Sequence, residues 1–254
     1  MTKRKIIIVL TFFILTSINA QNGSITVYLK DSNVVKIPLE QIDKISFSKK
    51  GKIERIVILG SSTAAGKGPS SIDSSWVNRF RRYAEKVNLL NKVINLAVSG
   101  YTTYHIMPDG FVPTKKNRPL PSKGHNITKA LELNPTSIII NLPSNDAFFK
   151  YSVDEQIANY KVILKKAKEQ NVPVWITTTQ PRNNNSDSTM TKELITMRDS
   201  TYSLCGNHTI DFWTTLATEK GKINPKYDSG DGIHLNDAGH KILFERVVVK
   251  GIIQ

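Results

Sequence analysis

The chain has 254 residues, of which 39% are hydrophobic, and it carries a formal net charge of +14 at pH 7. This length and hydrophobic content exclude a disordered chain and suit one α/β domain with a sizeable core. Lys and Arg are scattered, without a long basic run interleaved with aromatic residues, so the charge does not indicate a nucleic-acid partner.

Residues 1–20 have the layout of a secretory signal peptide. Three basic residues at positions 3–5 precede an almost wholly apolar run over residues 6–15, and a short segment ending in Ala20 follows. We therefore expect cleavage after Ala20 and a secreted or periplasmic protein. A membrane anchor is the alternative interpretation. Because the apolar run is well short of the roughly 20 residues that span a bilayer, we expect no stable membrane insertion after cleavage.

Residues 21–50 are predicted to form a small β-rich unit and a linker. Residues 25–29 alternate apolar and polar side chains, a turn-like segment follows at 31–33, and residues 34–37 resume the extended pattern. Residues 41–47 alternate again. The pattern predicts a β-hairpin unit ahead of the main domain.

The main domain, residues 51–254, alternates strand and helix patterns. Short apolar segments predict strands over residues 55–59, 93–96, 137–141, 174–178 and 209–212. Helical spacing predicts helices over residues 76–88, 127–133, 153–170, 192–204 and 237–249, with Ser152 as the cap of the third. Strands separated by helices of this length form a parallel sheet covered on both faces. We therefore predict a three-layer α/β/α sandwich with a mostly parallel sheet.

The first strand of this domain ends in a turn that carries hydroxyl groups. Gly60 is followed by Ser61, Ser62 and further small residues, which permit a sharp turn at the carboxyl end of the sheet. A hydroxyl such as that of Ser62 is placed there to act as a nucleophile or to cradle a phosphate. The phosphate-loop spacing is absent, since Gly60 and Gly66 are separated by five residues and no hydroxyl residue follows Lys67. A nucleotide-binding enzyme is therefore disfavoured.

A carboxylate and an imidazole lie close together near the C-terminus, at Asp231 and His234. At this spacing the carboxylate can accept the ring Nδ1–H, which fixes the tautomer and leaves Nε2 free as a base. Taken alone, the same spacing also fits a surface pair or a helix cap.

Two further strand ends offer hydrogen-bond donors. Asn145 follows the strand at 137–141, and its amide can donate to a developing oxyanion, although a turn and helix cap explain it as well. Gly100 follows the strand at 93–96, where a bare backbone N–H can approach a substrate, and a plain turn glycine is the alternative.

These motifs together resemble the SGNH (GDSL-type) hydrolase superfamily of esterases. They occur in the order of that family from about residue 53 to the C-terminus: a Ser after the first strand, a Gly after the second, an Asn after the third, and Asp-x-x-His near the end. The resemblance implies a flavodoxin-like sandwich, Ser62 as nucleophile, His234 as base and Asp231 as the residue that orients it. It implies an oxyanion hole formed by the N–H groups of Ser62 and Gly100 and the amide of Asn145, with neither a metal ion nor a cofactor.

Two positions depart from the family pattern. The usual Gly-Asp-Ser is Gly60-Ser61-Ser62, so the acidic neighbour is missing, and the Gly two residues before the Asn is Pro143. The first departure alters hydrogen bonds behind the nucleophile, and the second shifts the loop that carries Asn145. From the sequence alone, Ser61 remains a competing nucleophile. An enzyme of this family with weakened activity or none remains an alternative.

The long segment over residues 104–126 bears on the substrate. It is rich in Pro, Lys and Gly, and polar, basic walls suit a sugar better than an acyl tail. Tyr101, Tyr104 and Arg118 are candidate sugar contacts. We predict a serine esterase whose partner is an acylated carbohydrate, from which it removes a small acyl group such as acetyl. The alternatives are a lipase or lysophospholipase-type acylhydrolase, and a non-catalytic glycan-binding protein on the same scaffold.

Overall fold

The computed structural model describes residues 18–19, 23–28, 33–39, 52–183 and 188–253, and the chain divides into two compact units, Met1–Lys52 and Ile53–Gln254. The first unit contains an antiparallel sheet in the order β1–β2–β3. Its strands are β1 (Ile18–Asn19), β2 (Ser24–Tyr28) and β3 (Val34–Pro38).

The predicted β-hairpin is confirmed by the pairing of β2 with β3. The strand predicted over residues 41–47 lies outside the described residues. So does the predicted signal peptide, except for the two residues of β1. Cleavage after Ala20 therefore stays a prediction.

The second unit is built on a five-stranded parallel sheet in the order β5–β4–β6–β7–β8. The strands are β4 (Arg55–Gly60), β5 (Lys92–Asn95), β6 (Ser137–Asn141), β7 (Val174–Thr177) and β8 (Thr209–Ile210). All five predicted strands are present. The last is two residues shorter than expected, because the Asp211 side chain accepts the N–H groups of Trp213 and Thr214 and turns the chain.

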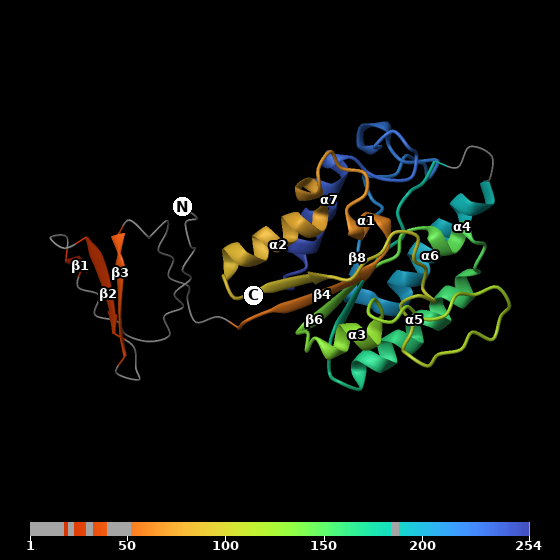
Figure 1. Cartoon of the computed structure of the whole chain (residues 1–254). Coiled ribbons are helices and arrows are strands. Elements are labelled where there is room, and N and C mark those ends of the chain that lie inside the picture. The colour runs from red at the N-terminus through yellow and green to blue at the C-terminus, as the bar shows by residue number, and fades with distance from the viewer. Residues whose placement is uncertain (1–17, 20–22, 29–32, 40–51, 184–187, 254) are drawn as a thin grey trace. The chain divides into compact units, whose positions relative to one another are not determined.

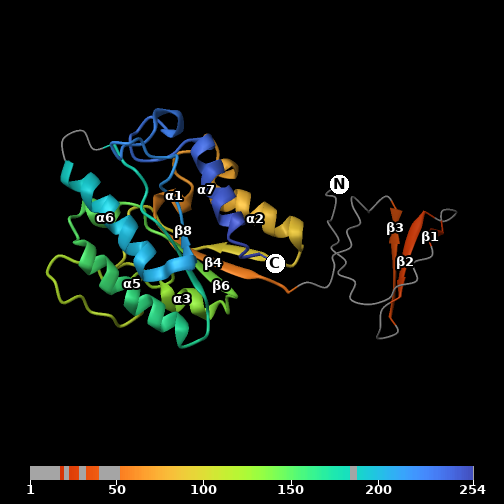
Figure 2. The same cartoon turned by 180° about the vertical axis from the view of Figure 1, so that it is seen from behind.

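Helices cover both faces of this sheet, as Figures 1 and 2 show from opposite sides. One face carries α2 (Trp76–Val87) and α7 (Asp237–Val249), and the other carries α3 (Ile127–Glu132), α5 (Val153–Lys168) and α6 (Ser188–Cys205). The shorter helices are α1 (Ser62–Ala65), α4 (Asn145–Phe148) and the 3-10 turns η2 (Ile72–Ser74), η3 (Gly206–His208) and η4 (Pro225–Tyr227). The three-layer α/β/α sandwich is confirmed. In the part of the chain that the structure describes, no helix combines the length and apolarity needed to cross a membrane.

Strand β4 explains why the sheet needs a helical layer on each face. Its apolar residues alternate, so that Ile56 and Ile58 join the cluster under α2 and α7, whereas Val57 and Leu59 join the cluster under α3 and α5. All four side chains are fully buried. Burial of each stabilises the fold by about 1.5–3 kcal/mol.

The strand order places a crevice at the carboxyl ends of β4, β5 and β6. From the central strand β4 the chain first goes to β5 on one side and then returns to β6 on the other. The loops after these strands therefore part at the point where the direction of winding reverses, which is where open α/β sheets bind ligands.

Candidate active site

Ser62 is the first residue of α1, directly after β4. The turn is tight: a Cβ at Gly60 would collide with the Asn141 carbonyl oxygen, and the N–H of Ser61 donates to that same oxygen at 3.0 Å. Ser61 is fully buried, and its Oγ has no partner among the described residues. Ser62, in contrast, lines a pocket. Of the two competing hydroxyls, Ser62 is the one open to a substrate.

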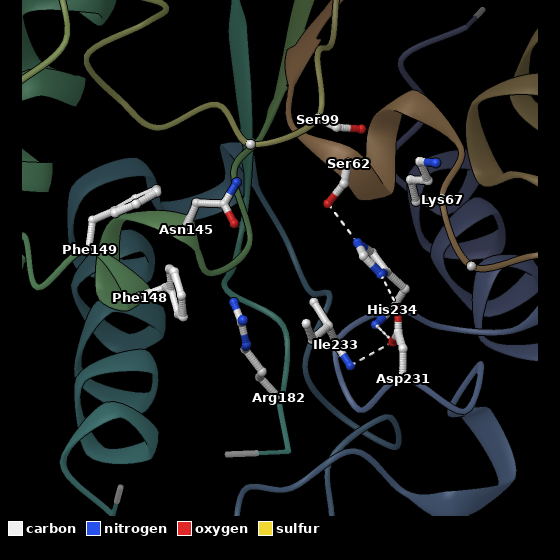
Figure 3. A pocket seen from close by; sticks show the side chains of 12 residues that line it. Ser62, Lys67, Ser99, Asn145, Phe148, Phe149, Arg182, Asp231, Ile233 and His234 are labelled. Atoms are coloured by element: carbon white, nitrogen blue, oxygen red, sulfur yellow. Dashed lines mark hydrogen bonds and ion pairs between the residues drawn. The ribbon is translucent and has the colours of Figure 1, made fainter. Parts of the chain in front are cut away.

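His234 brings its ring to Ser62 from the other end of the domain. Its Nε2 lies 2.8 Å from Ser62 Oγ, and its Nδ1 lies 2.5 Å from Asp231 Oδ2. Figure 3 shows the three side chains in one continuous hydrogen-bonded line. If the neutral ring donates its Nδ1–H to the carboxylate, Nε2 has a free lone pair directed at the serine hydroxyl.

Asp231 is held as a carboxylate. Burial opposes its ionisation, but hydrogen bonds from the His234 ring and from the backbone N–H groups of His234 and Ile233 outweigh that effect and lower its pKa well below the ordinary value. Ser229 Oγ donates to the same carboxylate at 3.1 Å. The charge is therefore present at neutral pH to orient the ring and to stabilise its protonated form.

A buried histidine supports the segment that carries His234. His240, in α7, is fully buried, accepts the N–H of Trp76 at Nδ1, and lies with Nε2 at 3.1 Å from the Lys67 carbonyl oxygen. Since Nδ1 is the acceptor, Nε2 carries the proton. Burial lowers the pKa of His240 to about 4. This contact ties α7 to the loop of Lys67 and Gly68, where a Cβ at Gly68 would collide with the His234 side chain.

The three residues predicted to form the oxyanion hole, Ser62, Gly100 and Asn145, line the same pocket. The backbone N–H groups of Ser62 and Gly100 have no hydrogen-bond partner among the described residues, and Gly100 has φ +86°, which favours glycine. Asn145 begins α4 and lies across the pocket from Ser62 (Figure 3). Its Nδ2 donates to the Tyr101 carbonyl oxygen at 2.9 Å, so the amide is fixed and a second N–H remains. Pro143 has not displaced Asn145 from the pocket.

Asp146 joins the loop after β6 to the loop after β5. Its carboxylate accepts the backbone N–H and the hydroxyl of Thr103 and is almost fully buried. Burial raises its pKa to about 6, against the lowering effect of these hydrogen bonds. The segments that carry Asn145 and Gly100 are thereby held together.

The pocket has a volume of about 480 Å³. The other residues that line it were not predicted from the sequence: Lys67, Gly68, Ser99, Phe148, Phe149, Arg182 and Ile233. Phe148 and Phe149 follow Asn145 in the chain, and Arg182 follows β7. Their position after strands of a parallel sheet was the available signal.

The predicted sugar contacts Tyr101, Tyr104 and Arg118 do not line this pocket. Tyr104 donates its hydroxyl hydrogen to Glu155 of α5 at 2.6 Å, and Arg118 pairs with the same carboxylate at 2.5 and 3.1 Å. The Tyr101 ring stacks on His105. Tyr104 and Arg118 therefore take part in the folding of the long segment onto α5, whereas Tyr101 contacts residues of that segment itself. Among the described residues, no cluster of His, Cys, Asp or Glu is arranged to hold a metal ion.

Comparisons with solved structures find the same fold at low identity. A variant of an acetyl xylan esterase from Geobacillus stearothermophilus is 16% identical with a TM-score of 0.60, over 79% of this chain and 96% of that one. A psychrotrophic esterase from a Pseudoalteromonas species is 18% identical with a TM-score of 0.55, over 78% and 96%. A GDSL-like lipase from Bacteroides thetaiotaomicron is 17% identical with a TM-score of 0.56, over 78% and 87%.

The sequence itself matches a family profile. No curated protein matches the chain. The profile described as the GDSL-like Lipase/Acylhydrolase family matches residues 58–242, from β4 to α7. That span includes Ser62, Gly100, Asn145, Asp231 and His234. The chain belongs to the GDSL-like lipase/acylhydrolase family and is a serine ester hydrolase on the SGNH fold, as the order of its motifs predicts.

Proposed function

We propose that this protein is a secreted esterase that removes a small acyl group, acetyl in the first place, from a carbohydrate, with Ser62 as nucleophile, His234 as base and Asp231 as the residue that orients it. The observation that carries the proposal is the hydrogen-bonded line from Ser62 Oγ through the His234 ring to Asp231, open to a pocket.

The reaction proceeds through an acyl-enzyme. A serine hydroxyl is a weak nucleophile at neutral pH, so His234 Nε2 takes its proton as Ser62 Oγ attacks the ester carbonyl carbon. The carbonyl oxygen gains negative charge and accepts from the N–H groups of Ser62 and Gly100 and from the Asn145 amide. Loss of one such donor typically costs about 3 kcal/mol of transition-state stabilisation. His234 then protonates the leaving alcohol and afterwards activates the water that releases the acid.

The preference for a carbohydrate ester is supported by the pocket walls. Polar groups line it together with Phe148 and Phe149, each about half exposed. Exposed aromatic rings give a flat apolar surface against which a sugar ring can pack. One of the proteins with the same fold is described as an acetyl xylan esterase. The same apolar rings also favour the second candidate, an acylhydrolase for longer acyl chains.

A pair of assays tests the proposal. Acetate release from acetylated xylo-oligosaccharides is measured together with hydrolysis of 4-nitrophenyl acetate and 4-nitrophenyl decanoate, with Ser62→Ala as control. We expect acetate release and faster turnover of the acetyl ester, both lost in the variant. Faster turnover of the decanoyl ester would favour the long-chain acylhydrolase.

Labelling separates an enzyme from a binding protein. A fluorophosphonate probe is expected to label Ser62, whereas a folded protein that resists the probe would be a non-catalytic glycan binder. Export is tested separately, by N-terminal sequencing of protein recovered outside the cytoplasm, which is expected to begin at Gln21.

A further inference from the structure

Arg182 is the one pocket residue that combines deep burial with a charge that no carboxylate contacts in the described part of the chain. The residue is 8% exposed and lies in the segment after β7. In Figure 3 its guanidinium lies between Phe148 and Ile233, on the same side of the pocket as Asn145.

Among the described residues, the interactions of Arg182 leave most of its donors unused. Its Nη1 lies 3.5 Å from Ser144 Oγ, at the outer limit of a hydrogen bond, and its Cζ lies 4.7 Å from the centre of the Phe148 ring. A guanidinium has five N–H donors. Phe148 offers only a π-face, so several donors remain available to a ligand in the pocket.

Asp231 does not neutralise this cation. It is near enough to influence Arg182 electrostatically, but its two oxygens are engaged by His234, Ile233 and Ser229. The other cation in the pocket lining, Lys67, adds positive charge. The site therefore presents an excess of positive charge to its substrate.

We infer that Arg182 binds a carboxylate of the substrate, so that the enzyme prefers esters that carry a carboxylate near the scissile bond. Arginine suits this ligand because its planar fork can donate two parallel hydrogen bonds to one carboxylate. The residue is already largely buried in the folded chain, so the carboxylate finds a preorganised donor. This inference rests on the proposed esterase function and narrows its substrate class.

The carboxylate has two possible sources, and matched substrates distinguish them. On the sugar side, an O-acetylated galacturonate oligosaccharide is compared with its methyl ester. On the acyl side, mono(4-nitrophenyl) succinate is compared with its methyl ester. The first pair differs in the charge of its galacturonate carboxylates, and the second pair differs in the charge of one carboxylate. Wild-type kcat/KM is expected to favour the charged member of one pair by on the order of tenfold to a hundredfold, mainly through KM.

Substitutions at Arg182 test the residue itself. Arg182→Gln is expected to reduce the charged-to-neutral ratio of kcat/KM to near one, and Arg182→Lys, which keeps the charge without the fork, to an intermediate value. Lys116→Gln, an exposed cation outside the pocket, is the matched control and is expected to keep the wild-type ratio. Assays in 0.5 M NaCl screen the long-range attraction of the basic surface.

The outcomes are distinct for the two proposals. The inference is overturned by a wild-type charged-to-neutral ratio of kcat/KM near one in both pairs, or by an unchanged ratio in a folded Arg182→Gln protein. In either case, hydrolysis of the neutral esters still supports the esterase function. The proposed esterase function is itself overturned if wild type hydrolyses none of the four esters or does not react with fluorophosphonate. If Arg182→Gln does not fold, a protection experiment on wild type takes its place. Trigalacturonate or succinate is expected to protect Ser62 from the fluorophosphonate probe, and the corresponding methyl ester is not. Equal protection by the acid and its methyl ester in both cases would contradict the inference.

Discussion

Ser61 and Ser62 are adjacent hydroxyls in opposite environments, and this contrast gives a first prediction. Ser62→Ala removes the nucleophile, so kcat for 4-nitrophenyl acetate is expected to fall by a factor on the order of 10³ or more. Ser61→Ala removes a buried hydroxyl whose Oγ has no partner among the described residues, so activity and stability are expected to stay close to wild type. A large loss of activity in Ser61→Ala with Ser62→Ala still active would reverse the assignment.

Asp231→Asn tests whether the carboxylate fixes the imidazole tautomer. An amide N–H₂ directed at His234 Nδ1 favours the tautomer with the proton on Nε2, which then cannot accept from Ser62. We expect kcat to fall by a factor on the order of 10⁴ with little change in KM. The thermal unfolding midpoint, measured on the same samples, controls for damage to the turn. A variant that keeps near-wild-type kcat would exclude this role.

His240 gives a prediction about stability and pH. Its pKa is lowered to about 4 in the folded chain, against about 6.5 when unfolded. The unfolded chain therefore binds more protons between these values, and the stability from a neutral His240 is present above about pH 6.5 and lost as the pH falls towards 4. The loss is about 3 kcal/mol.

The measurement for His240 compares wild type with His240→Asn, whose side chain can still accept the Trp76 N–H. Urea unfolding at pH 7 and at pH 4.5 gives the change in the free energy of unfolding for each protein. We expect wild type to lose more stability than the variant over this interval. Equal losses would mean that other groups account for the acid sensitivity.

Among the elements, the segment between β5 and α3 depends on one carboxylate of α5. Glu155 accepts from Tyr104, Lys115 and Arg118. Burial opposes its ionisation, but these hydrogen bonds lower its pKa to about 2. The ionised Glu155 stabilises the folded chain at pH values above its pKa in the unfolded chain, about 4.3. This stabilisation is lost as the pH falls towards 2.

Glu155→Gln is therefore expected to reduce the free energy of unfolding by about 3 kcal/mol at pH 7, because two cations lose their partner. The difference from wild type should shrink at pH 3. Glu132→Gln is the matched control, since its ion pair with Lys129 is exposed, and it should change stability by less than about 0.5 kcal/mol. A Glu155→Gln protein as stable as the control would show that the segment is held by other contacts.

The sequence predicts helices well where the periodic spacing of apolar residues extends over several turns. The apolar positions of α5 and its cap Ser152 are examples, and α7 has the predicted bounds. Helices α1 and α4 were missed because four residues do not complete a second turn. The role of Arg118 was missed for a different reason: its partner Glu155 is 37 residues away, and no local pattern reports such a contact.

At the scale of the molecule, topology brought the predicted site together. Ser62, Gly100 and Asn145 follow three neighbouring parallel strands, so their positions at one edge of the sheet follow from the strand order. His234 and Asp231 come from a segment before α7, and their approach to Ser62 depends on the packing of α7 against α2. The sequence could supply the motif order but not the pocket walls, because a position after a strand does not tell which side chains, such as those of Arg182, Phe148 and Phe149, turn into the pocket.

The division into two units gives the last prediction. Every residue of the candidate site and all three hydrophobic clusters of the described chain lie in Ile53–Gln254. A protein that begins at residue 53 should therefore fold and hydrolyse 4-nitrophenyl acetate with kcat/KM within about twofold of the protein that begins at Gln21. The shortened protein carrying Ser62→Ala controls for background hydrolysis. A folded but inactive shortened protein would mean that residues before 53 complete the site, and an unfolded one would mean that they complete the core.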